Sequence, residues 1–198
     1  MAAVTLPLFP LHTVLFPQGP LGLRIFEPRY LDMVRRCTRQ GGSFVVVTIL
    51  EGQEAGAAAR IANFGTQARI VDFDPLPDGL LGISCLGGQR ARVLRFWQQS
   101  DGLNLGEVEL VEAPPASALP AELQDLADLL RAVLPKLGDP YAQLETRYED
   151  AGWVADRWAE VLPLSALQKL VLLEEDDPLA RLAQVAAWSG RQPPAAHV

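Results

Sequence analysis

Apolar and polar residues follow two different periods along the chain, and the change falls near residue 113. Before it, short runs rich in β-branched and aromatic residues alternate with turns of Gly, Pro and Asp, as is typical of β-strands. After it, apolar residues recur every three or four positions, which indicates amphipathic helices. The pattern predicts a β-rich domain over residues 1–113, a helical domain over residues 114–190 and a flexible tail over residues 191–198.

Six runs in the β-rich domain have the length and composition of strands. They are Leu21–Phe26, Phe44–Leu50, Ala68–Phe73, Leu80–Leu86, Arg90–Trp97 and Gly106–Val111. Tight turns are expected at Pro75–Gly79 and Ser100–Gly102, because the Asp-Gly pair in each supplies the positive φ that a hairpin needs. Along Arg90–Val93, alternation places the two arginines on one face and the two apolar residues on the other. Strands joined in this way suggest a small closed or partly closed barrel, which hides its edges.

One helix is predicted within the β-rich domain, from Pro28 to about Gln40. Proline suits the first position of a helix, and the following pair Gly41-Gly42 is expected to end it. Its apolar stripe is formed by Leu31, Val34 and either Cys37 or Thr38.

The helical domain is predicted to contain five helices, separated by prolines and capping residues. The predicted elements are Pro120–Leu134, a helix starting at Asp139-Pro140, Trp153–Leu162, Ser165 to about Glu175, and Leu179–Ser189. Asp177-Pro178 starts the last of these, since Asp is a good cap and Pro suits the first helical position.

The segment Arg24–Tyr30 sets the charged residues Glu27 and Arg29 among apolar and aromatic residues, where a predicted strand runs into the predicted helix. With Leu6–Leu11 and Leu15–Pro17, it resembles the start of the amino-terminal substrate-recognition domain of Lon proteases, which also occurs alone as a LON-domain protein. Further segments that resemble the same family are Phe64–Val71, Leu76–Gly79, Gly87–Val93, Leu162–Leu164, Gln168–Glu174 and Asp177–Leu182. The resemblance covers residues 4 to about 186.

This resemblance implies an α+β fold, in which a PUA-like β-barrel with one crossing helix is followed by an all-helical bundle. It also implies a non-catalytic module that binds unfolded or exposed polypeptide segments, in protein quality control and together with a separate protease or chaperone. The chain departs from the family pattern at Ala91, where the family often has an aromatic residue. Full Lon proteases continue into an ATPase and a Ser/Lys protease domain, and this chain has neither, so no enzymatic activity is expected.

The residues themselves do not favour a catalytic, metal or cofactor site. Neither glycine pair, at 41–42 or 87–88, is followed by the Lys-Ser/Thr of a phosphate loop, so no cofactor is expected. Ser165 and Lys169 are interpreted as a helix cap and a solvated charge rather than as a nucleophile and its base. His12 is interpreted as a loop or partly buried histidine. The cysteines form no CxxC pattern, and the acidic run 174–177 directs its carboxylates apart on a helix, so no metal site is expected.

Six residues are candidate family-motif or partner-contact residues. They are Phe26, Glu27, Arg29, Tyr30, Trp153 and Trp158. The two charged residues are expected to pair with each other or with backbone groups and so to lock the strand-to-helix turn, although they also suit the polar groups of a peptide. The aromatic pair Phe26 and Tyr30 is interpreted as core. At least one of the two tryptophans is expected to border a groove between the two domains, because large aromatics are frequent in binding hot spots.

Charge argues against nucleic acid as a partner. Residues 1–113 hold 10 Arg and 11 Asp and Glu, net −1, and residues 114–198 hold 7 Lys and Arg and 13 Asp and Glu, net −6. A nucleic-acid binder normally has a basic excess. An RNA-binding PUA-like module is the alternative, and it requires one continuous face formed by Arg24, Arg60, Arg69, Arg90, Arg92 and Arg95.

The composition, 49% hydrophobic and 21% charged, is ordinary for a soluble globular protein. No stretch reaches the roughly 18 uninterrupted apolar residues of a membrane helix. The first residues have neither a basic n-region nor a continuous apolar h-region. We therefore expect a cytoplasmic protein without a membrane partner, and the sequence leaves its oligomeric state open.

Overall fold

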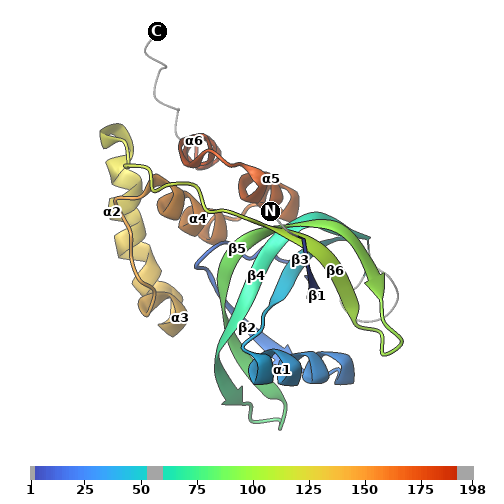
Figure 1. Cartoon of the computed structure of the whole chain (residues 1–198). Helices are drawn as coiled ribbons and strands as arrows, with labels where there is room; N and C mark the ends of the chain where they lie inside the picture. Colours follow the sequence, from blue (N-terminus) through green and yellow to red (C-terminus); the bar gives the residue numbers. More distant parts are fainter. Residues whose placement is uncertain (1–2, 53–59, 191–198) are drawn as a thin grey trace. The chain divides into compact units, whose positions relative to one another are not determined.

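The structure, a computed structural model, describes residues 3–52 and 60–190. The chain separates into two compact units, residues 1–113 and 114–198. Figure 1 shows that the first unit contains the strands β1 to β6 and the helix α1, and that the second consists of helices and their connections. The predicted tail, residues 191–198, lies outside the described residues.

The first unit is built on one mixed sheet of six strands. The elements are β1 (Val4–Leu11), β2 (Pro20–Ile25), α1 (Pro28–Gln40), β3 (Phe44–Glu51), β4 (Arg60–Pro75), β5 (Leu81–Gln98) and β6 (Asn104–Val111). The strand order is β2-β5-β4-β3-β1-β6, and β5 also pairs with β6. Because β5 pairs with β6, the five strands β6, β1, β3, β4 and β5 form a closed cycle of paired neighbours. Among the described strands, β2 alone has a single partner.

The strand β1 is missing from the predicted strands, because prolines argue against a central strand. The pairing shows how its prolines are accommodated. Pro7 lies opposite Leu105 of β6, beyond the residues that pair with β3, and Pro10 lies opposite Val47 of β3, beyond those that pair with β6. Each proline thus has a ladder on one side only, where a missing N–H group is tolerated.

The strand β5 joins two runs that were predicted as separate strands, so the predicted break at Gly87-Gly88 is wrong. Gly87 does not form a turn but allows the backbone of Phe16 to lie close to β5. A Cβ added at Gly87 would lie 2.1 Å from the carbonyl oxygen of Phe16. The other predicted strands are present with shifted ends, and Ala68–Phe73 is only part of β4. The two predicted turns are confirmed, with positive φ at Gly79 and Gly102.

Two clusters of buried apolar side chains stabilise the first unit. One contains Leu8, Val45, Val47, Ala91, Val93 and Val108. The other packs α1 on the sheet and contains Phe9, Phe44, Ile83 and Cys85 together with Tyr30, Met33, Val34 and Cys37 of the helix. The helix has the predicted bounds and ends at Gly41 with φ of 60°. Its buried stripe includes the predicted Val34 and Cys37, whereas Leu31 is only partly buried.

The second unit consists of short helices. They are α2 (Gln124–Val133), α3 (Asp139–Ala142), α4 (Ala151–Val161), α5 (Ala166–Glu174) and α6 (Pro178–Trp188), with 3₁₀ turns at Ala121–Leu123 and Leu134–Leu137. Ser165 and Asp177 cap α5 and α6 with their side chains, as predicted. The short helix α3 starts at Asp139 as predicted, and its N-cap is Gly138 rather than an Asp. None of the described helices has both the length and the apolar character of a membrane span.

Two glycines of the sheet should respond differently to alanine. A Cβ added at Gly65 would lie 2.2 Å from the carbonyl oxygen of Val46, whereas a Cβ at Gly22 has nothing within 4 Å. We expect Gly65→Ala to lower the free energy of unfolding by about 1–3 kcal/mol, because β3 and β4 have to shift apart. Gly22→Ala should change it by less than about 0.5 kcal/mol. Urea unfolding followed by circular dichroism measures both values, and equal effects would contradict the close approach at Gly65.

Candidate functional site

At the junction of β2 and α1, residues Phe26–Tyr30, the backbone changes from extended to helical. Glu27 is the N-cap of α1, with φ of −76° and ψ of 134°. Its carbonyl oxygen accepts hydrogen bonds from the N–H groups of Tyr30 and Leu31, both at 3.0 Å. Pro28 follows in the first turn, where its missing N–H group is not needed. The Glu27 side chain makes no cap bond, so its carboxylate is available to a neighbouring cation.

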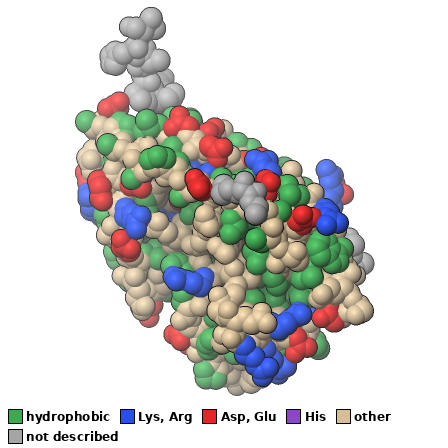
Figure 2. Space-filling model, viewed as in Figure 1, with side chains coloured by type: hydrophobic (Ala, Val, Ile, Leu, Met, Phe, Trp, Pro, Cys, Tyr) green, Lys and Arg blue, Asp and Glu red, His purple; other side chains and the backbone are tan. Residues whose placement is uncertain are grey.

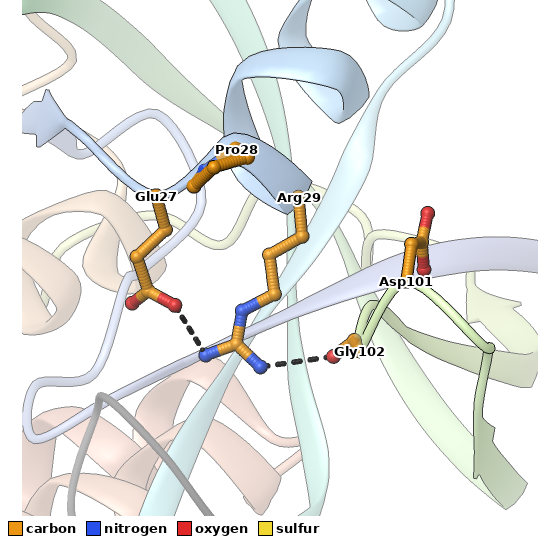
Figure 3. Close-up of a pocket in the computed structure, with 5 residues that line it drawn as sticks. All are labelled: Glu27, Pro28, Arg29, Asp101 and Gly102. Carbon is orange, nitrogen blue, oxygen red and sulfur yellow. Dashed lines mark hydrogen bonds and ion pairs between the residues drawn. The ribbon is translucent and has the colours of Figure 1, made fainter.

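The Arg29 guanidinium connects this β2–α1 junction to the turn between β5 and β6 (Figure 3). It forms an ion pair with the Glu27 carboxylate at 2.8 Å and donates a hydrogen bond to the Gly102 carbonyl at 2.9 Å. It also lies 4.7 Å from the centre of the Tyr30 ring. The side chains of Arg29 and Glu27 are only 11% and 23% exposed. The predicted pairing is present, as charges buried to this degree require.

The turn that receives Arg29 is held by its own hydrogen bonds. The Asp101 carboxylate accepts from the Leu103 N–H at 2.9 Å. Gly102 has φ of +83°, a conformation that favours glycine, and its carbonyl also accepts from the Gln98 side-chain amide at 3.1 Å. The acceptor for Arg29 is therefore held in position by contacts that do not involve the guanidinium.

A pocket of about 290 Å³ lies at this place, lined by Glu27, Pro28, Arg29, Asp101 and Gly102 (Figure 3). The Nε atom of Arg29 is buried and has no hydrogen-bond partner in the described part of the chain. The Asp101 carboxylate points away from the guanidinium. The lining carries two carboxylates and a guanidinium, which are groups that make polar contacts.

The two aromatic residues of the junction lie in different environments. Tyr30 is 5% exposed, and its ring centre lies 4.2 Å from that of Phe9. Phe26 is 60% exposed, so its interpretation as a core residue is wrong. Alternation at the end of β2 explains the difference: Ile25 points into the core, and the next side chain points away from it. Phe26 therefore stays a candidate contact for a partner.

Trp153 and Trp158 both belong to α4 and are 4% and 9% exposed. The ring N–H of Trp158 donates to the Leu126 carbonyl at 3.1 Å. Trp153 meets the ring of Tyr148 edge-on, with the centres 5.0 Å apart. Both side chains contribute to the core around α4, and a place for either beside a groove stays a prediction.

The residues weighed for catalysis have structural roles instead. Ser165 forms a capping box with Gln168, which confirms its interpretation as a cap. The Lys169 ammonium donates to the Glu160 carbonyl at 3.2 Å, and burial lowers the pKa of Lys169. Lys169 is therefore partly buried, and its interpretation as a solvated charge is wrong.

The two cysteines are both buried within the first unit. Burial raises the pKa of Cys37 and raises the pKa of Cys85 to about 12. A thiol in such surroundings stays protonated at neutral pH and is a poor nucleophile. The described residues contain no group of three or more His, Cys, Asp or Glu side chains that would hold a metal ion.

The second unit contains buried ion pairs that were not predicted from the sequence. Arg157 of α4 is fully buried and donates two hydrogen bonds, both of 2.8 Å, to the carboxylate of Glu160. Burial raises the pKa of Glu160, and Arg157 opposes this shift. Arg181 of α6 is 3% exposed and donates to the carboxylate of Asp156. The sequence does contain one indication of these pairs. The α4 segment is apolar around most of its circumference, so charged side chains within it need partners.

A model of one protein family matches residues 5–188; its description is the ATP-dependent protease La (LON) substrate-binding domain. The chain belongs to this family. The resemblance predicted from the opening segment is thereby confirmed, and the Lon substrate-binding domain covers both units of the chain.

Solved structures share this fold. The Lon N-terminal domain protein from Xanthomonas campestris is 44% identical, with a TM-score of 0.78, over 93% of this chain and 98% of that chain. The N-terminal domain of the Mycobacterium avium complex Lon protease is 19% identical, with a TM-score of 0.65, over 94% of this chain and 98% of that one, and it supports the fold alone. The coarse prediction of a mixed α and β fold is confirmed: the Lon N-terminal domain fold combines a mixed sheet with helices.

Curated relatives are longer proteins. A LON peptidase N-terminal domain and RING finger protein of Schizosaccharomyces pombe is 24% identical over 92% of this chain and 44% of its own length. Protein cereblon of Gallus gallus is 28% identical over 62% of this chain and 28% of its own length. The chain thus spans less than half the length of these relatives.

The arginines that RNA binding requires are largely neutralised or buried in this Lon substrate-binding domain. Three are paired with carboxylates: Arg24 with Asp78, Arg60 with Glu51 and Arg95 with Glu107. Arg90, predicted to share a face with Arg92, is only 3% exposed and lies over the ring of Phe64. On the face seen in Figure 2, Lys and Arg side chains are scattered among Asp and Glu. The arrangement does not favour binding of a phosphate backbone.

Removal of the Arg29 side chain should destabilise the first unit. We expect Arg29→Ala to lower the free energy of unfolding by about 1–3 kcal/mol, because it removes a charge-assisted hydrogen bond and the ion-pair partner of Glu27. The matched control is Arg35→Ala on the same helix, where the Arg35–Asp32 pair is 66% and 60% exposed and the change should stay within about 0.5 kcal/mol. Chemical denaturation measures both. An Arg29→Ala protein as stable as the Arg35→Ala control would contradict the structural role of the pair.

The contribution of the buried pair Arg157–Glu160 to the stability of the second unit should depend on both partners together. We expect Glu160→Leu to cost about 3–5 kcal/mol, because the buried Arg157 loses its bidentate partner, and the double variant Arg157→Met/Glu160→Leu to recover most of this loss. The control is Asp128→Leu, since Asp128 and Arg131 have the same i,i+3 spacing but are 62% and 48% exposed. Thermal and urea unfolding compare the variants. A double variant as unstable as Glu160→Leu would mean that packing, not charge, decides the effect.

Proposed function

We propose that this chain is a non-catalytic module that binds unfolded or exposed apolar polypeptide segments. The observation that carries the proposal is the match of residues 5–188 to a substrate-binding domain, which spans nearly all of the described residues. Polypeptide is the substrate class of that domain in Lon proteases. The arrangement of the arginines supports the choice of polypeptide over RNA.

Exposed apolar side chains of the first unit support this proposal. Large apolar side chains with 38% to 60% exposure are Val4, Phe26, Val71, Phe73, Leu94, Phe96 and Trp97. Four of these are aromatic, and aromatic side chains are enriched in surfaces that bind other proteins. They provide apolar contact area for the segments that a folded protein hides and an unfolded one exposes.

The structural roles of the candidate nucleophiles support a function without catalysis. The hydroxyl of Ser165 is engaged in the cap of α5, and the ammonium of Lys169 in a bond to the Glu160 carbonyl. Both thiols are buried and have raised pKa values. A nucleophile needs exposure and a nearby base, and these groups have other partners or surroundings.

The proposed architecture is a PUA-like barrel, residues 1–113, followed by a helical bundle, residues 114–190. The cyclic pairing of β6, β1, β3, β4 and β5 supports the first part, and the helical composition of the second unit supports the other. The proposed partners are unfolded polypeptide chains, delivered to a separate protease or chaperone in the cytoplasm. The curated relatives match this chain over only 44% and 28% of their own length, which fits a recognition role within longer proteins.

Binding should discriminate between two states of one protein. We expect fluorescence anisotropy to show that reduced, carboxymethylated α-lactalbumin binds at least tenfold more tightly than native α-lactalbumin, because only the unfolded form exposes apolar segments and free backbone. A single-stranded RNA of matched size is the control and should not bind at physiological salt. Equal affinity for both forms of α-lactalbumin would overturn the proposal, and tight RNA binding that weakens steeply with salt would favour the alternative.

A further inference from the structure

The strand β2 has an unusual position in the sheet. It pairs with β5 alone, from Pro20 opposite Leu86 to Ile25 opposite Leu81, whereas each of the other described strands has two or three partners. In an antiparallel pair, alternate residues direct their N–H and C=O groups toward the partner, and the residues between them direct these groups away. One edge of β2 therefore presents a row of peptide groups on the side away from β5.

These outward groups have no partner in the described part of the chain. Apart from the ladder to β5, the backbone of residues 20–25 takes part in no hydrogen bond with a described residue. The backbone is also accessible to solvent near the middle of the strand, because Gly22, which has no side chain, is exposed. The guanidinium of Arg24, the one charge on β2, is directed to the Asp78 carboxylate. It therefore does not cover the edge.

The end of β4 offers a useful contrast. Its residues beyond Ala68 pair with β5 but not with β3, so they too have an open edge. This edge carries residues that disfavour pairing with another strand. They are the carboxylates Asp72 and Asp74 and the proline Pro75. The N–H of Phe73 is also taken up by the Asp72 carboxylate at 2.8 Å. In β2, by contrast, proline occurs only at the first residue, where it does not block the rest of the strand.

Open peptide groups of a strand are satisfied best by another extended backbone. We propose that the free edge of β2 binds an extended polypeptide segment and adds it to the sheet as a further strand. This inference rests on the proposed function and names the surface that carries it. An unfolded chain suits the site because its own peptide groups are unpaired, whereas those of a folded protein are already paired.

The side chains around the edge define what kind of segment fits. Leu21 and Leu23 are partly buried against the core, and Phe26 lies just beyond the strand with 60% of its surface exposed. Main-chain bonds supply affinity that does not depend on sequence, and these apolar side chains favour apolar residues at alternate positions of the segment. Proline within the segment is disfavoured, because it removes a donor from the new ladder.

Backbone methylation of the ligand tests the proposal directly. The probe is a fluorescein-labelled nonapeptide of alternating Val and Thr, and its twin carries N-methyl groups on the five central residues. We expect the twin to bind at least tenfold more weakly, because it keeps the side chains but cannot donate to β2. Equal binding of the two peptides would overturn the inference and leave the proposed function intact. Failure of both peptides, with carboxymethylated α-lactalbumin still bound, would also overturn it, whereas failure of all three probes would reject the proposed function.

Crosslinking then locates the peptide. Gly22→Cys and the control Arg35→Cys, at an exposed position of α1, each receive a maleimide–benzophenone group, while the buried Cys37 and Cys85 stay unlabelled. We expect the Gly22→Cys protein to capture the unmethylated nonapeptide at least fivefold more than the control. Equal capture at both positions would overturn the assignment to β2. Crosslinking of Gly22→Cys to a second copy of the chain, in place of the peptide, would assign the edge to self-association and overturn the polypeptide partner.

Discussion

The two-sided contact of the Arg29 guanidinium is the constraint on which the first unit depends. A guanidinium removed from water is stable only when its donors are paired, and here Glu27 and the Gly102 carbonyl provide the acceptors. Glu27 is also the N-cap of α1, so the same contact fixes where β2 ends and in which direction the helix starts. That direction places Tyr30 on Phe9 and packs the helix on the sheet.

The sheet itself is shaped by residues that strand prediction usually treats as breakers. The two prolines of β1 lie where that strand has a single neighbour, and Gly87 permits a carbonyl approach that no side chain would allow. These features let β5 run without a break and pair with three strands. The consequence is a pairing that leaves β2 with one partner, and hence with an open edge. The recognition surface that we propose thus depends on the order of the strands rather than on a set of reactive side chains.

This kind of surface agrees with the chemistry of the rest of the molecule. Ser165, Lys169 and both cysteines have structural surroundings that favour stability over reactivity. Many of the arginines are paired with carboxylates, which reduces attraction for phosphates. The proposed function fits main-chain recognition, since unfolded polypeptides share a backbone but not a sequence.

The sequence by itself determined the family, because the segments that resemble it follow one another along most of the chain. It also determined the bounds of α1, the caps at Ser165 and Asp177, both tight turns and the pairing of Glu27 with Arg29, because each of these depends on residues close together in the chain. The strand β1, the continuity of β5, the exposure of Phe26 and the burial of Arg90 and Arg157 were decided only by the tertiary structure. Each of these depends on which distant segment lies alongside, and local propensity carries no information about that neighbour. The open edge of β2 is of the same kind: a strand pattern predicts that peptide groups need partners, but only the assembled sheet shows which of them are left without one.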